Sequence, residues 1–273
     1  MHEFALYGQV PKEIHHRTLQ QLAGYTRMQP IDASEIHLVF QARQPSGLDK
    51  IPSAGGSQGV LQPDVQRWKN MLNASLYYVQ LVGEVATPIS SSPESKPTDG
   101  TGDVTMTNGG GPDLNSLINW TLEFRDTPDP GKQAVSTRLI SRTPLDEGSL
   151  MTFMDHFGYE YVSRYMLTGF KFYDNDTTLY LHKVLTLPQG SVESAMTDFS
   201  FLSNISELGD LDGSGGALLQ ASIDVVDGNN PELKDRATRQ LLALKEGFKQ
   251  GVDLTPGDRL ALDTRLPAVN RRI

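Results

Sequence analysis

Apolar residues recur at every second position in several short stretches of the chain, which is typical of β-strands with one buried face. In residues 34–43, for example, Ile36, Leu38 and Phe40 share one face. Comparable stretches predict further strands over residues 3–10, 76–85, 117–125, 134–143 and 217–226.

The strongest pattern lies in residues 153–188, where the tail of a helix, a long aromatic strand, a turn and a second long strand follow one another. The turn is Asp174-Asn175-Asp176, and Asn and Asp tolerate the positive φ of tight hairpin turns. Aromatic residues occupy both odd and even positions of this hairpin, so one face needs cover from a helix of this chain or from another protein. The candidate partner contacts are Tyr161, Phe170 and Phe172.

Helical spacing of apolar residues is clearest in residues 231–250, where Leu233, Ala237, Leu241, Leu244 and Phe248 share one face. Pro231 stands at the start of this stretch and Gly251 just past its end, as is typical of helix boundaries. Further helices are predicted over residues 12–25, 63–73 and 145–157.

Two polar stretches interrupt the regular pattern, at about residues 44–62 and 87–115. Their Ser, Pro, Thr and Gly content buries too little apolar surface to offset the entropy of ordering, so we predict disordered insertions. The remainder of residues 1–267 is predicted to be a single domain whose last segment, residues 254–267, docks in extended form. Residues 268–273 are expected to form a free tail.

The predicted elements amount to about eight strands, joined mainly as hairpins or through single helices. Strand and helix do not alternate regularly, and a large antiparallel sheet tends to close because closure removes its edges. The fold class predicted is therefore α+β, a many-stranded antiparallel β-barrel or strongly curved sheet with a few packed helices.

Composition narrows the range of partners. The chain has 273 residues, 38% of them hydrophobic, and a formal net charge of −9, which argues against direct binding to the phosphates of nucleic acid. There are no cysteines, so disulfides, thiolate metal sites and thiol catalysis are excluded. No signal peptide or run of apolar residues long enough for a membrane span is present, and we expect an intracellular protein.

Motifs for chemistry are sparse. The phosphate loop, the nucleophile elbow and the zinc helix are all missing from the sequence, and no two histidines have metal-ligand spacing, so we expect no catalytic residue, cofactor or metal. Asp210, Asp212, Ser214 and Gly215 match the first half of a calcium loop, but Ala221 stands where the bidentate Glu is required. We interpret this stretch as a glycine-rich surface loop.

A barrel can also enclose a tunnel that cleaves triphosphates on a divalent metal, which needs acids at alternate strand positions. Each acid considered stands alone on its predicted strand: Glu3, Glu84, Glu123 and Glu160. Four basic residues are candidates for lining a cavity, although we interpret them as solvated: Arg138, Arg142, Arg164 and Lys171. A tunnel-type metal-dependent triphosphate phosphohydrolase and a barrel for a small ligand remain the alternatives to a non-enzymatic interaction protein.

Several stretches together resemble a known family. They are HEFALYGQVP at the start, SEIHLVFQAR at residues 34–43, W-x-L-E-F-R at residues 120–125 and FMDHFGYEYVSRYMLTGFKFY at residues 153–173. The chain resembles the fungal subunit 18 family of the Mediator complex over nearly its full length apart from the polar insertions. The most specific part is Phe157-Gly158-Tyr159-Glu160-Tyr161, followed by Gly169-Phe170.

This resemblance implies an antiparallel barrel subunit of the Mediator head module, located in the nucleus and without catalytic residues. Members of the family pair with Mediator subunit 20 and are tethered by the C-terminal helix of Mediator subunit 8. Through the head module they contact the RNA polymerase II initiation machinery and regulate transcription.

Overall fold

The computed structural model describes residues 1–43, 76–85, 118–145, 150–188 and 198–266. The predicted insertions over residues 44–62 and 87–115, the predicted helix over residues 63–73 and the tail at residues 268–273 lie outside these ranges. The predictions about those segments stay predictions.

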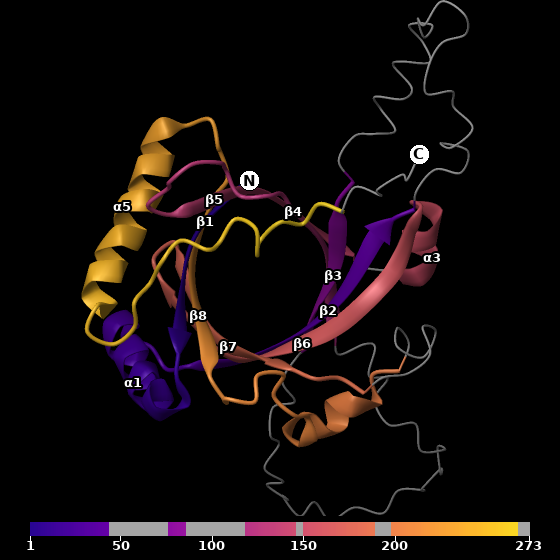
Figure 1. Ribbon diagram of the computed structural model, residues 1–273, viewed down its shortest axis with the longest axis horizontal. Helices are drawn as coiled ribbons and strands as arrows, with labels where there is room; N and C mark the ends of the chain where they lie inside the picture. The colour runs from indigo at the N-terminus through magenta and orange to yellow at the C-terminus, as the bar shows by residue number, and fades with distance from the viewer. Residues whose placement is uncertain (44–75, 86–117, 146–149, 189–197, 267–273) are drawn as a thin grey trace, which may run out of the picture.

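Strands dominate the part of the chain that the structure describes (Figure 1). The strands are β1 (His2–Val10), β2 (Ile31–Ala42), β3 (Tyr78–Val85), β4 (Ile118–Arg125), β5 (Ser136–Leu145), β6 (Tyr159–Asp174), β7 (Thr177–Leu185) and β8 (Ala217–Val225). The α-helices are α1 (His15–Thr26), α3 (Leu150–His156) and α5 (Pro231–Phe248), and short 3₁₀ helices cover η1 (Lys12–Ile14) and η4 (Ser200–Glu207).

The eight strands close into one antiparallel barrel in the order β1-β5-β4-β3-β2-β6-β7-β8. Closure depends on β1, which pairs with β8 from His2 to Val10 and with β5 only from His2 to Ala5. The prediction of an antiparallel barrel with a few packed helices is confirmed. No helix in the described ranges is long and apolar enough to cross a membrane.

Apolar side chains of the barrel point mainly outward and polar ones inward. On β2, Ile36, Leu38 and Phe40 are at most 1% exposed and belong to an apolar cluster outside the barrel wall. Their neighbours Glu35 and His37 line the interior. The strand period of two thus separates an apolar outer face from a polar lumen.

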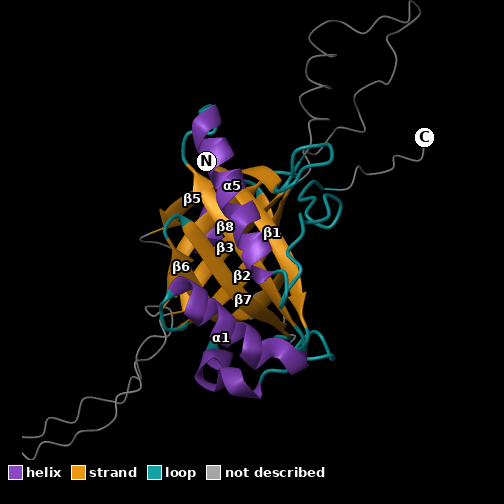
Figure 2. Ribbon diagram, turned by 90° about the vertical axis from the view of Figure 1, so that its left-hand side faces the viewer, coloured by secondary structure: helices purple, strands orange, loops and turns teal. Residues whose placement is uncertain are grey.

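Helices α1 and α5 cover one side of the barrel (Figure 2). Leu241 and Leu244 of α5 and Leu22 of α1 are buried in one cluster with outward residues of β1, β7 and β8. The Asn230 side chain caps α5 by accepting hydrogen bonds from the backbone amides of Glu232 and Leu233. The helix predicted over residues 231–250 is confirmed and ends at Phe248.

The β6–β7 hairpin has the predicted turn. Asp174 pairs with Thr177, and Asn175 between them has φ 51°, the left-handed conformation that asparagine tolerates. Gly169 lies against β7 so closely that a Cβ there would be 2.0 Å from the Leu181 carbonyl oxygen. The glycine permits this close approach of the two strands.

The helix predicted over residues 145–157 is shorter in the structure. Leu145 is the last residue of β5 and pairs with Trp120 of β4, so strand pairing takes precedence over helical spacing there. The helix α3 runs from Leu150 to His156.

The segment from residue 252 to residue 266, which we call the C-terminal strap, passes across one end of the barrel (yellow in Figure 1). Thr255 and Tyr7 exchange two backbone hydrogen bonds of 2.8 Å, and the Tyr78 amide donates to the Thr264 carbonyl at 2.8 Å. Thr264 Oγ1 donates to the Arg125 carbonyl at 2.6 Å. The prediction that this segment docks is confirmed, but it is extended only in part, because residues 259–262 form a turn in which the Leu262 amide donates to the Asp258 carbonyl.

Candidate functional site: the barrel lumen

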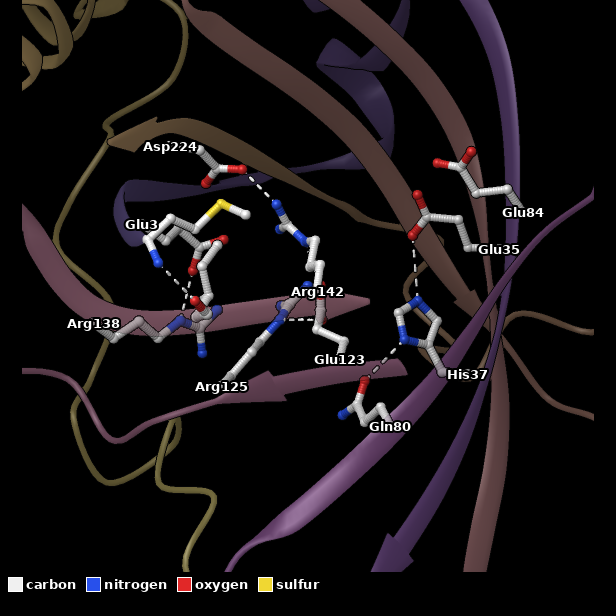
Figure 3. A network of polar contacts seen from close by, with 12 residues as sticks. Glu3, Glu35, His37, Gln80, Glu84, Glu123, Arg125, Arg138, Arg142 and Asp224 are labelled. Carbon is white, nitrogen blue, oxygen red and sulfur yellow. Dashed lines mark hydrogen bonds and ion pairs between the residues drawn. The ribbon is translucent and has the colours of Figure 1, made fainter. Parts of the chain in front are cut away.

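The lumen contains a cavity of about 670 Å³ lined by charged, polar and aromatic residues from several strands and from the C-terminal strap, together with aliphatic residues such as Leu167, Val184 and Leu218. Figure 3 shows its network of polar contacts. Leu211 lines the cavity and is 65% exposed, so the cavity reaches the protein surface.

The first ion pair joins β1 and β5. Arg138 Nε donates to Glu3 Oε2 at 2.5 Å, and the side chains are 6% and 1% exposed. Glu3 Oε1 accepts from Gln220 Nε2 on β8 at 3.4 Å. Glu3 and Arg138 are register partners across the β1–β5 pair, so the strand pairing that closes the barrel also brings the two charges together.

The second cluster lies on β4 and β5. Glu123 accepts from Arg125 Nε through Oε1 and from Arg142 Nε through Oε2, the latter at 2.6 Å. Arg142 also bonds to Asp224 of β8. Burial alone would raise the pKa of Glu123, but the charge of Arg125 and hydrogen bonds from both arginines lower it below its ordinary value. Glu123 is therefore a carboxylate at neutral pH.

The third cluster connects β2, β3 and β6. Lys171 Nζ lies 2.6 Å from Glu35 Oε1 and 3.2 Å from Glu84 Oε1, and His37 lies between Glu35 Oε2 and Gln80 Oε1 at 3.3 and 2.9 Å. Burial acts to raise the pKa of Glu35, but the His37 hydrogen bond and the Lys171 charge outweigh it and lower the pKa to about 2.

Two aromatic–histidine pairs line the same cavity. The rings of His37 and Tyr165 stack with centroids 4.7 Å apart, and those of Tyr180 and His182 lie 4.5 Å apart. Burial lowers the pKa of His182 to about 4 and raises that of the Tyr180 hydroxyl, so both groups are neutral at physiological pH. Within the described ranges, the Tyr180 hydroxyl oxygen is buried without a hydrogen-bond partner.

The interpretation of four basic strand residues as solvated is wrong for three of them. Arg138, Arg142 and Lys171 line the lumen, whereas Arg164 lies outside it and donates to the carbonyls of Asp198 and Pro188. Glu3 and Glu123 are each the one acid on their strand, as predicted, but arginines from β5 reach both of them. One signal in the sequence was a polar residue between large apolar ones, such as His37 between Ile36 and Leu38.

The three candidate partner contacts lie in different environments. Phe172 is 0% exposed in the cluster under α1 and α5, so its side chain offers no accessible surface in this chain. Phe170 packs partly buried against the same cluster. Tyr161 is partly buried on the outer wall near α3, where its ring meets Phe40 edge-on with centroids 5.9 Å apart.

A β-bulge decides the orientation of Tyr161. Val39 pairs with Ser163 and Phe40 with Tyr161, so Val162 has no counterpart on β2. The extra residue reverses the alternation, and Tyr161 points outward although Tyr165, also at an odd position, points into the lumen. The aromatic side chains of the hairpin are thus divided between the lumen and the outer apolar clusters.

Metal-ligand groupings are missing from the described ranges, in which no three His, Asp or Glu side chains are arranged to hold a metal ion. In the loop that partly resembles a calcium site, Asp210 pairs with Lys183 at 2.7 Å and Asp212 accepts from Ser214. The carboxylates of Glu3 and Glu123 face guanidinium groups in the lumen, which differs from the metal-bound acids that the tunnel hypothesis requires.

The fold and the lumen define a class: a closed antiparallel barrel with an internally ion-paired lumen and helices packed on its outer wall. Residues 2–265 match the family model described as Med18 protein. A relative in Coccidioides immitis named Mediator of RNA polymerase II transcription subunit 18 is 43% identical over 97% of this chain and 100% of that protein. A relative of the same name in Aspergillus fumigatus is 38% identical over 97% of this chain and 99% of that protein. The chain belongs to this Mediator subunit 18 family.

A solved structure of the Schizosaccharomyces pombe Mediator head module contains a chain with the same fold, with a TM-score of 0.63, 17% identity and coverage of 97% of this chain and 100% of that one. This likeness shows a shared fold, and the family match and the relatives above confirm the family resemblance found in the sequence. The relatives are named as subunits of a transcription complex and not for a catalytic activity, in agreement with a non-enzymatic protein.

Proposed function

We propose that this chain is a non-catalytic subunit of the Mediator head module in the nucleus and regulates transcription by scaffolding contacts to the RNA polymerase II machinery. The observation that carries this proposal is the 43% identity to a subunit 18 relative over the whole of that protein. The shared barrel fold of a head-module chain supports it.

The partners that we propose are Mediator subunit 20, as a heterodimer, and the C-terminal helix of Mediator subunit 8. The RNA polymerase II initiation machinery is contacted through the assembled head module. The net charge of −9 suits protein partners better than nucleic-acid phosphates.

The surface that we propose for one of these contacts surrounds the start of β6, and we call it the β6 apolar surface: Phe153, Phe157, Tyr159, Tyr161 and Val162. Phe157 is 67% exposed and Val162 43%, while Tyr161 and Tyr159 are partly buried beside them. Phe153 and Phe157 have ring centroids 4.7 Å apart, so the exposed ring is held by an anchored one. Exposed aromatic groups of this kind are enriched at protein interfaces.

Co-expression with subunit 20 and the C-terminal segment of subunit 8, followed by size-exclusion chromatography, tests the assembly. We expect one peak containing all three chains at micromolar concentration. Separate elution of the purified chains would contradict the proposed partners.

The surface itself is tested by Phe157→Ser with Leu260→Ser as the matched control, because Leu260 is 78% exposed on the C-terminal strap, away from β6. Neither substitution removes buried surface that the fold requires. We expect Phe157→Ser to weaken complex formation at least about tenfold and Leu260→Ser to leave it unchanged. Equal affinities of the two variants would exclude the β6 apolar surface as the contact.

A further inference from the structure

Two arginines in the lumen have hydrogen-bond donors to spare. A guanidinium group carries five N–H donors. Arg125 and Arg138 each use Nε for a carboxylate, and their Nη atoms donate to no side chain that the structure describes. Both residues line the cavity, so these donors border it. The side chain of Arg125 is 26% exposed.

Each oxygen of the nearby carboxylates Glu3 and Glu123 already accepts one hydrogen bond, although a carboxylate oxygen can accept two. Both oxygens of Glu123 accept from arginines, and those of Glu3 accept from Arg138 and Gln220. Three guanidinium groups therefore face two buried carboxylates, while the third acid, Asp224, has a side chain that is 37% exposed at the rim. The three guanidinium groups and three carboxylates balance in charge, and the Nη donors of Arg125 and Arg138 are left without a side-chain acceptor in the described structure.

Register places the free donors close together. Arg125 pairs with Ile140, so Arg138 is its diagonal neighbour on the inner face of the β4–β5 pair, within reach of a long side chain. Figure 3 shows both side chains in the lumen.

A second polar group in the same cavity lacks a partner. Tyr180 is 7% exposed and lines the cavity, and its hydroxyl oxygen is buried without a hydrogen bond in the described structure. A buried hydroxyl without a partner is unfavourable, so a bound group that supplies one is stabilised there.

We propose that the lumen binds a small phosphate-bearing molecule, with the phosphate oxygens accepting from the Nη atoms of Arg125 and Arg138. The planar guanidinium fork matches phosphate geometry, and a cavity of about 670 Å³ has the size of small-molecule sites in proteins. The exposed Leu211 marks where the cavity meets solvent. The site is independent of Mediator assembly.

Isothermal titration of the purified full-length chain with inorganic phosphate and, in a second arm, with adenosine monophosphate tests this proposal. The informative variant combines Glu3→Gln with Arg138→Gln, which removes the fork at constant net charge. Its matched control combines Asp176→Asn with Arg236→Gln, an exposed pair whose side chains are 58% and 57% exposed. Thermal unfolding confirms that both double variants are folded.

We expect saturable binding by the wild-type chain, at least about tenfold weaker binding by the Glu3–Arg138 variant, and unchanged binding by the control. Tighter binding of the monophosphate would identify a phosphate ester as the ligand, and equal binding would identify free phosphate. In the wild-type chain, phosphate should also shift the Nε–H resonance of Arg138 in NMR spectra.

The expected dissociation constant is about 0.1 mM, so a probe concentration of 10 mM lies on the order of a hundredfold above it. The proposal would be overturned if the wild-type chain bound neither probe at that concentration. Equal loss of binding in both double variants would overturn it as well, because that result assigns phosphate to surface charges. Either failure leaves the proposed function untouched, since the titration uses the chain without its partners.

Discussion

Replacing Arg138 by glutamine removes the cation from a deeply buried ion pair and leaves the Glu3 carboxylate in place. The two side chains are 6% and 1% exposed, and Nε and Oε2 lie 2.5 Å apart. The carboxylate then keeps only the long 3.4 Å bond from Gln220 as a direct hydrogen bond in the described structure. The variant therefore holds a buried charge without its partner.

The expected loss is large. Two unit charges about 4 Å apart interact by about 4 kcal/mol at the effective dielectric constant of about 20 that suits protein sites. Removing one member of a buried pair costs about 3–5 kcal/mol, because the other charge stays desolvated. We expect Arg138→Gln to lower the free energy of unfolding by about 3 kcal/mol or more. Replacing both Glu3 and Arg138 by glutamine should cost about 1 kcal/mol, since two amides can share a hydrogen bond.

Urea unfolding followed by tryptophan fluorescence measures these free energies, because Trp120 lies on β4 of the barrel wall. A double-mutant cycle with Glu3→Gln separates the coupling between the two residues from their single effects. The exposed pair of Asp176 and Arg236 supplies a control for which we expect a loss below about 1 kcal/mol. A loss below about 1 kcal/mol for Arg138→Gln, or additive single effects, would refute the reasoning.

Three further predictions concern the free energy of unfolding. Gly169→Ala should cost about 1–3 kcal/mol, because its Cβ would meet the Leu181 carbonyl oxygen at 2.0 Å. Gly24→Ala on α1 should gain about 0.5–1 kcal/mol, because no described atom lies within 4 Å of its Cβ position. Similar effects of both substitutions in urea titrations would contradict this. Asn230→Ala should cost about 1 kcal/mol, because it removes the side-chain cap of α5. Asn230→Ser should keep a stability close to that of the wild-type chain, and thermal unfolding followed by circular dichroism measures both variants. Burial lowers the pKa of His182 to about 4, against 6.5 in the unfolded chain, so the neutral ring contributes stability above about pH 6.5 that is lost as the pH falls towards 4. Up to about 3 kcal/mol of the pH dependence of the unfolding free energy should therefore disappear in His182→Gln. An unchanged pH dependence in this variant would exclude the assignment.

Much of the fold follows from periodicity along the chain. The alternation of Ile36, Leu38 and Phe40 predicts a strand, and the helical spacing of Leu241, Leu244 and Phe248 predicts α5, because each pattern depends only on neighbours in the sequence. The Asn175 turn is predicted for the same reason, since its residues carry their own preference for positive φ. The limits of α3 were less predictable, because Leu145 is held in β5 by its pairing with Trp120.

The sequence by itself therefore determined the strands, the principal helix, the antiparallel class and the family. Only the tertiary structure decided which face of each strand is the lumen, because alternation separates two faces without saying which one turns inward. The convergence of Glu3 with Arg138 depends on the β1–β5 register that closes the barrel, and the outward orientation of Tyr161 depends on a bulge opposite β2. Both are set by pairing between residues distant in the chain, which no local pattern contains.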